Sequence, residues 1–276
     1  MSKKLILTSL FYIGIILLLF FSLFPFIQML STSLKAPSAQ FTVPPLWIPE
    51  QITFENFYAA IQYKEFVRYF MNSLFISIIT CVLVIIISLL AAYSFTRLEF
   101  PGRRIFLNVI LVSQMFCLSA IVIPLYKLVG SLGMLNSYWG LILVYIAFTV
   151  PVAVWLLRSF LLNIPKDMEE SAMIEGASKF TAFFKVVIPL LRPGIGATAA
   201  YVFLITWQEF LFSLVFMSKP EYRTLPVGIM DFKGQYETNW GTMMASSILI
   251  SIPVLILFMF IQKQLISGLT EGATKG

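Results

Sequence analysis

The sequence predicts an all-α membrane protein, and three observations carry that prediction. Of the 276 residues, 59% are hydrophobic and only 12% are charged. The mean hydropathy of +0.91 lies well above that of an ordinary soluble domain. Six apolar stretches approach or exceed the roughly 20 residues that a helix needs to cross a bilayer. We therefore expect six transmembrane helices, at about 6–29, 70–94, 105–126, 138–160, 194–217 and 242–263.

Charge and composition exclude several other classes of protein. The formal net charge of +6 does not indicate a nucleic-acid partner, because the cations flank apolar stretches instead of forming one basic face. The chain has no histidine, which is the commonest metal ligand and general base. Cys81 and Cys117 lie inside apolar stretches, so we expect neither a disulfide nor a metal site. No GxxxxGK[ST] phosphate loop occurs, so we expect the chain itself to bind no ATP.

The distribution of cations predicts the topology. Lys3 and Lys4 precede the first apolar stretch, which is longer than a signal-peptide core and has no small-residue cleavage site before Ser31, so we expect residues 1–30 to remain as a membrane helix. With both termini in the cytoplasm, twelve Lys and Arg residues lie inside and seven outside. This arrangement also places the loop at 162–193 in the cytoplasm.

The remaining segments follow from this topology. Residues 31–69 contain four prolines and oppose a continuous helix, so they form an external loop that lies over the outer face. Residues 70–265 form a core of five helices interrupted by the loop at 162–193. Residues 266–276 form a cytoplasmic tail.

The loop has the pattern of two short helices joined at a tight corner. Asp167 is a suitable N-cap, and Glu170 follows at the spacing of a capping box. Gly176 can adopt the left-handed conformation that ends a helix, and Ser178 can cap the next one. The second helix is expected to run to Pro189 and Pro193.

This pattern resembles the EAA loop in the membrane subunits of bacterial ABC importers. That loop reads Glu-Ala-Ala, three residues, Gly, nine residues and Ile-x-Leu-Pro. Here Glu170-Ser171-Ala172 precedes Gly176, and Val186-Val187-Ile188-Pro189 follows at the required distance. The departures are Ser for one Ala, and Val and Ile for Ile and Leu. The alternative is an ordinary amphipathic loop with a chance glycine.

The C-terminal tail indicates a narrower family among these importers. It reads Gly268-Leu269-Thr270-Glu271-Gly272-Ala273-Thr274-Lys275-Gly276. Together with the loop, it is similar to the shorter membrane subunit of the maltose-type permeases, carbohydrate uptake family 1. The resemblance implies a type I ABC importer (MetI-like) transmembrane domain in a bacterial cytoplasmic membrane, surrounded by lipid. It also implies import of a di- or oligosaccharide, with a homologous permease subunit, two ABC ATPase subunits and an extracytoplasmic sugar-binding protein as partners. ATP and Mg would be bound by the ATPases, so this chain would be neither an enzyme nor the holder of a cofactor.

The resemblance also implies roles in the loop. Its first helix would dock into a groove on the ATPase and pass ATP-driven motion to the membrane helices. The residues that would couple the two are Glu169, Glu170, Ala172, Met173, Ile174, Gly176 and Ala177.

A substrate pathway is predicted around the fifth stretch. Trp207, Gln208 and Glu209 offer an aromatic plate and hydrogen-bonding groups for a sugar, and Gln114 in the third stretch is a weaker candidate. Successive helical residues point about 100° apart, so at most two of the first three face one lumen. A carboxylate near the midplane is costly, and the alternative for Glu209 is a structural hydrogen bond across a helix interface.

Two rival classes remain at this point. An ion-gradient-driven secondary transporter would need ionisable residues in several spans, and only Glu209 is evident. A membrane-embedded enzyme would need a convergent acid pair or a histidine.

Overall fold

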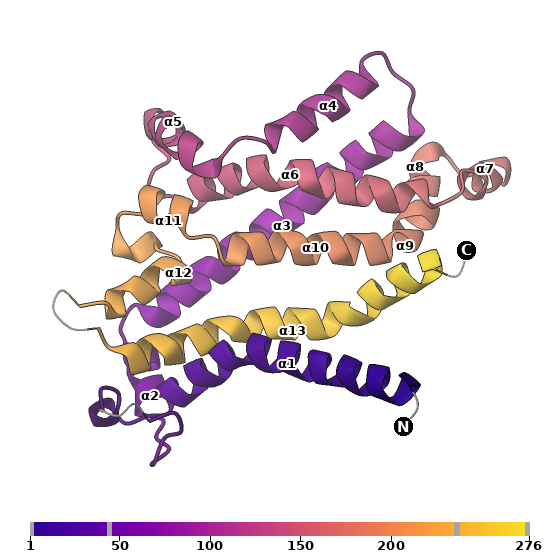
Figure 1. Ribbon diagram of the computed structural model, residues 1–276. Coiled ribbons are helices and arrows are strands. Elements are labelled where there is room, and N and C mark those ends of the chain that lie inside the picture. The colour runs from indigo at the N-terminus through magenta and orange to yellow at the C-terminus, as the bar shows by residue number, and fades with distance from the viewer. Residues whose placement is uncertain (1–2, 43–45, 235–237, 274–276) are drawn as a thin grey trace. The chain divides into compact units, whose positions relative to one another are not determined.

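The computed structural model describes residues 3–42, 46–234 and 238–273, which are almost entirely helical (Figure 1). Within these ranges the only β feature is an isolated bridge between Lys233 and Thr238. The all-α fold class predicted from the sequence is therefore confirmed. The chain divides into two compact units, one formed by residues up to Val67 with Gly228–Ile252 and the other by Arg68–Val227 with residues from Pro253 onward.

The first unit joins the start of the chain to a late segment. It contains α1 (Lys3–Ser33), η1 (Pro37–Ala39), α2 (Glu55–Gln62), η4 (Ile229–Phe232) and the first part of α13 (Trp240–Ala273). The buried side chain of Asn56 donates to the carbonyls of Ser33 (2.9 Å) and Lys35 (2.7 Å). The Gly241 N–H donates to Gln40 Oε1 at 3.0 Å, and a Cβ at Gly241 would lie 2.1 Å from the Gln40 side chain. The Asn56 bonds therefore join α2 to the end of α1, and the Gln40 contact holds η1 against the beginning of α13.

The second unit contains most of the remaining helices. They are α3 (Phe66–Arg97), α4 (Arg103–Ser113), α5 (Leu118–Ser131), α6 (Tyr138–Leu162), α7 (Asp167–Ile174), α8 (Lys179–Ala182), the π-helix η2 (Phe183–Val187), α9 (Ile188–Leu190), α10 (Arg192–Trp207), α11 (Leu211–Phe216), η3 (Pro220–Tyr222) and α12 (Leu225–Gly228).

The described chain has four helices that are long and apolar enough to cross a membrane, or six spans if each of two bent pairs counts as one. The expected continuous helix at 105–126 is wrong, because α4 and α5 meet at 101°. The expected helix at 194–217 is also wrong as a single element. It ends at Trp207 and resumes at Leu211, and α10 itself follows the segment Lys179–Leu190 at a bend of 72°. The sixth helix, expected at 242–263, continues to Ala273.

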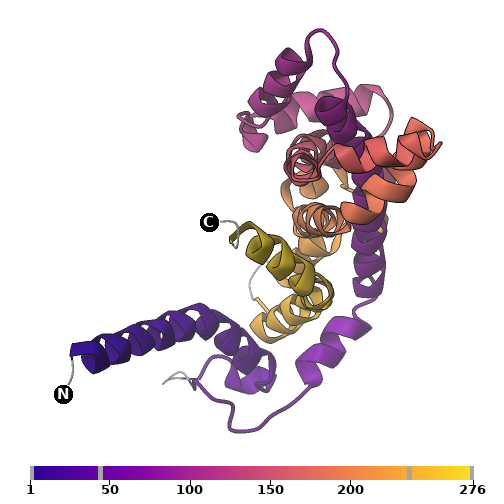
Figure 2. The ribbon, with the colours of Figure 1, turned by 90° about the vertical axis from the view of Figure 1, so that its right-hand side faces the viewer.

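The core of the second unit lies between α6, α10 and α3. Helices α6 and α10 lie side by side, and α3 crosses them, as both views show (Figures 1 and 2). Val84, Ala153 and Val202 meet where the three helices pack. A Cβ at Gly194 would lie 2.6 Å from the Phe160 ring, so the small residue allows α10 to approach α6 closely. This packing gives the loop at 162–193 and the two helix breaks a rigid support.

Candidate functional site

The loop between α6 and α10 has the predicted helix–corner–helix form. Helix α7 ends at Ile174, and Gly176 has a φ of +96°. The Gly176 N–H donates to Met173 O and the Ala177 N–H to Ala172 O, both at 3.0 Å. These two bonds form a Schellman motif, which requires a left-handed residue at this position.

The caps of the two short helices differ from each other. The Ser178 hydroxyl accepts the N–H of Thr181 at 3.2 Å, so the predicted cap of the second helix is confirmed. The predicted cap at Asp167 is wrong. Lys166 is the N-cap residue and makes no side-chain cap bond. Asp167 lies in the first turn, where the helix dipole stabilises its negative charge.

The second short helix passes through Pro189 and ends at Leu190, between the two prolines that were expected to mark its end. A π-helical turn over Phe183–Val187 precedes it, and α9 continues to Leu190. Proline has no N–H to donate to the preceding turn, so a wider turn is the natural local adjustment. The chain then bends by 72° into α10.

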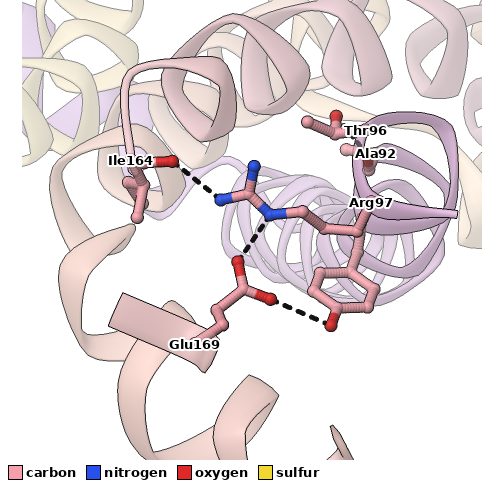
Figure 3. Close-up of polar contacts among 6 residues, drawn as sticks. Ala92, Thr96, Arg97, Ile164 and Glu169 are labelled. Carbon is pink, nitrogen blue, oxygen red and sulfur yellow. Dashed lines mark hydrogen bonds and ion pairs between the residues drawn. The ribbon is translucent and has the colours of Figure 1, made fainter. Parts of the chain in front are cut away.

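Glu169 points inward and joins α7 to the end of α3 (Figure 3). Its residue is only 5% exposed. One carboxylate oxygen pairs with Arg97 Nε at 2.5 Å, and the other accepts the Tyr93 hydroxyl at 3.1 Å. Arg97 also donates from Nη2 to the carbonyl of Ile164 at 2.8 Å. We call Tyr93, Arg97, Ile164 and Glu169 the latch, because together they bind α3 to both ends of the α6–α7 connection.

An apolar cluster lies beside the latch and continues it towards α6. The rings of Tyr93 and Phe183 meet edge to face with centroids 4.6 Å apart. Phe183 and Val187 are buried with Leu157 of α6 and with Leu191 at the start of α10. A displacement of the loop would therefore shift α3, α6 and α10 together, since close-packed interiors transmit strain.

The opposite face of the loop is exposed. Ile174 is 87% exposed and Phe180 is 72% exposed, while Met168 projects from the first turn of α7. Glu170 is exposed as well, one residue from the buried Glu169. Ala172, Met173 and Ala177 are half-buried at the corner. The seven residues predicted for coupling thus divide into Glu169, which faces the molecule, and a group that lies on or near the outer face.

The three consecutive candidates near the fifth stretch separate in the structure. Trp207 is buried, stacked on Phe203 with centroids 5.5 Å apart and edge-on to Phe70 at 5.6 Å. Gln208 is exposed at the end of α10. Glu209 lies in the break, where its oxygens accept the N–H groups of Phe212 (2.8 Å) and Ser213 (3.2 Å) at the start of α11.

The other break lies near the same part of α6. Glu209 accepts the hydroxyl of the buried Tyr145 at 2.6 Å, and Gln114 Nε2 donates to the carbonyl of Phe148 at 3.3 Å. Tyr145 and Phe148 are three residues apart on α6, so the structure brings Gln114 and Glu209 to neighbouring turns of that helix. Non-helical backbone at membrane depth is tolerated where protein or a water-filled cavity surrounds it.

Sequence reasoning missed three residues that hold these sites. Arg97, Tyr93 and Tyr145 reach their carboxylates across 72, 76 and 64 residues of sequence, respectively. The one available signal was Arg97 itself, a cation at the end of an apolar stretch that also serves as a topology marker.

Comparison with known proteins identifies the family. The family model described as "Binding-protein-dependent transport system inner membrane component" matches residues 84–271. The chain belongs to this family. It is accordingly a multi-pass permease of the cytoplasmic membrane.

Two curated relatives extend the similarity over nearly the whole permease. The diacetylchitobiose uptake system permease protein DasC of Streptomyces coelicolor is 37% identical over 253 residues, covering 92% of each chain. The trehalose/maltose transport system permease protein MalG of Thermococcus litoralis is 37% identical over 279 residues, covering 100% of each.

A solved structure has the same fold. A chain from a bacterial ABC transporter involved in importing the acidic polysaccharide alginate superposes with a TM-score of 0.82 at 22% identity, covering 95% of the permease and 98% of that chain. The expected MetI-like transmembrane fold is thereby confirmed.

Proposed function

We propose that this permease is a subunit of an ABC importer for di- or oligosaccharides, driven by ATP hydrolysis in separate ATPase subunits. The similarity to permeases named for diacetylchitobiose and for trehalose and maltose supports the substrate class. The proposed assembly contains a homologous permease, two ABC ATPases that hold ATP and Mg, and an extracytoplasmic sugar-binding protein. In this arrangement both termini and the loop at 162–193 face the cytoplasm.

The observation that carries the proposal is the two-sided form of the loop. Its outer face exposes the apolar side chains of Ile174 and Phe180 together with the charged Glu170. Large apolar side chains on a short protruding helix are typical of a surface that enters a groove on a partner. Its inner face is fastened by the Glu169–Arg97 ion pair.

The mechanism follows from these two faces. Closure of the ATPase pair on ATP would move the docked α7, and the latch would carry that movement to α3. Phe183, packed against Tyr93 and buried beside α6, would carry it to the helices that surround the pathway. The substrate pathway would then open outward, and ATP hydrolysis would return it to the inward-facing state.

For the substrate pathway we propose the region of the two helix breaks. Gln208 and Gln114 are exposed there and can present amide groups to a sugar hydroxyl. Glu209 has a structural part in this proposal, because both its oxygens already accept hydrogen bonds from α6 and α11. Trp207 supports Gln208 from within the core.

The energy source can be tested in membrane vesicles with a panel of labelled di- and oligosaccharides and the cognate binding protein. Uptake is expected to require ATP and to continue after ionophores have dissipated the proton and sodium gradients. Uptake that survives ATP depletion but stops with ionophores would instead identify a gradient-driven transporter. Vesicles without the binding protein serve as the control.

A further inference from the structure

A polar concavity lies at the turn between α3 and α4. Its volume is about 690 Å³, and its lining includes Arg103, Arg104, Arg158 and Glu99. Three guanidinium groups against one carboxylate leave the concavity positively charged. Among the described residues, none of the three arginines pairs with an acidic side chain within 4.0 Å.

The arginines are only partly satisfied within the chain. Arg103 donates to the carbonyl of Leu98 at 3.4 Å, a long bond. Arg158 lies over the Trp155 ring, 5.4 Å from its centroid, and its buried Nε has no hydrogen-bond partner in the described structure. Buried donors are normally satisfied, so this guanidinium nitrogen is a donor that an acceptor bound at the concavity can use.

The start of α4 adds further donors to the same place. Arg103, Arg104 and Ile105 form its first turn, behind Gly102 in the left-handed conformation with no side-chain cap bond. The Arg103 N–H donates to the carbonyl of Phe100 at 3.4 Å. The other N–H groups of a first helical turn have no intrahelical acceptor, and the helix dipole favours an anion beside them.

An apolar groove continues directly from the concavity. Ile105 lines both, and the groove of about 350 Å³ then follows one face of α4 past Val109, Val112 and Phe116. From Ile105 to Ser113 the helix covers about 12 Å. That length is comparable with one leaflet of the roughly 30 Å hydrocarbon core. A cationic pocket that opens into an apolar groove has the two-part form of a phospholipid.

We propose that this site binds an anionic glycerophospholipid, with its phosphate among the three arginines and the α4 N-terminus and one acyl chain along α4. The turn lies at the same end of the second unit as α7 and α8 (Figure 1), so the lipid belongs to the leaflet that faces the loop. Basic pockets between membrane helices on the cytoplasmic side are a known mode of headgroup binding. The proposal rests on the pocket and not on the transported substrate.

The test uses the assembled importer in mild detergent, incubated with phosphatidylglycerol or phosphatidylcholine of identical acyl chains and examined by native mass spectrometry. The wild type is expected to retain phosphatidylglycerol preferentially. Arg104→Gln and Arg158→Gln should each reduce that preference about fivefold, as expected for loss of one cation near a phosphate. Lys127→Gln removes an exposed cation from α5 and should change nothing.

Three results would overturn the proposal. Equal retention of the two lipids by the wild type would remove the anionic preference. Displacement of phosphatidylglycerol by millimolar glycerol phosphate would assign the pocket to a soluble anion. A photoreactive amino acid in place of Val109 that cross-links to another subunit and not to lipid would make the groove a protein interface; this last measurement leaves the arginines intact, so it does not depend on the folding of the charge variants.

Discussion

Two carboxylates of this permease, the buried Glu169 and the half-buried Glu209, each pair with a tyrosine but in different settings. Glu169 and Glu209 each accept a tyrosine hydroxyl from a long neighbouring helix, Tyr93 of α3 and Tyr145 of α6. Glu169 adds the guanidinium of Arg97, whereas Glu209 adds two backbone N–H groups of α11. One site therefore joins elements that are distant in sequence by an ion pair, and the other fixes a local break with backbone dipoles.

This difference indicates which site transmits motion. An ion pair between a loop and a long helix forces the two to move together, because separating them would leave a buried charge unpaired. A carboxylate that caps the next short helix keeps the break in one shape. We infer that the Glu169 site couples movement of the loop to α3 and that the Glu209 site maintains the wall of the pathway.

The largest expected effect comes from breaking the ion pair. Glu169→Gln leaves Arg97 buried without its anion, a change that costs about 3–5 kcal/mol for such pairs. Saccharide uptake by proteoliposomes should fall more than tenfold relative to ATP hydrolysis. Glu170→Gln, the same change one residue away on the exposed face, should leave folding within about 0.5 kcal/mol of the wild type.

A double-mutant cycle sharpens this prediction. Arg97→Gln with Glu169→Gln removes both charges, so the unfolding midpoint should recover part of the loss seen in either single variant. If the two losses simply add, the pair does not carry the coupling that we assign to it.

The next effect concerns the corner of the loop. Gly176→Ala places an L side chain at φ +96°, where the added Cβ meets no atom within 4 Å, so only backbone strain of about 1–2 kcal/mol is introduced. Gly133→Ala is a matched control, with φ +68° and equally open space. Thermal unfolding should shift similarly in both, but only Gly176→Ala should lower uptake per ATP hydrolysed. Equal transport by the two variants would contradict a docking role for the corner.

A smaller effect is expected at the helix break. Tyr145→Phe removes the hydroxyl and leaves Glu209 its two backbone donors, so we expect a loss of about 1 kcal/mol in stability. Tyr145 supports the wall of the pathway but does not transmit movement from the loop. The ratio of uptake to ATP hydrolysis should therefore stay at the wild-type value. A fall in that ratio would place transmission at Glu209 as well as at Glu169.

The smallest effect on stability is expected at the exposed amides. Gln208→Ala should leave the unfolding midpoint unchanged within about 0.5 kcal/mol. It should raise the KM for uptake severalfold if the side chain contacts the sugar. Gln28→Ala, at a half-buried glutamine of α1, is the comparison, and an unchanged KM in both variants would remove Gln208 from the pathway.

The sequence predicted features that depend on local pattern. Apolar length predicted the four long helices α1, α3, α6 and α13, and the spacing of Gly176 and Ser178 predicted the corner and one cap. The break after Ser113 was missed because Gln114 to Cys117 contains neither proline nor glycine, and the bond from Gln114 to Phe148 depends on tertiary packing. The latch was missed for the same reason, since nothing near Glu169 identifies Arg97 as its partner.

The most direct test of the central claim is a cross-link from the exposed face of the loop. A photoreactive amino acid in place of Ile174 should cross-link in native membranes to a protein that mass spectrometry identifies as a P-loop ATPase. The same group in place of Leu132 should not. Leu132 is the exposed residue that follows α5, and Figure 1 shows α5 at the opposite end of the second unit from α7. Adducts from position 174 with lipid alone, or equal ATPase adducts from both positions, would contradict docking of this loop.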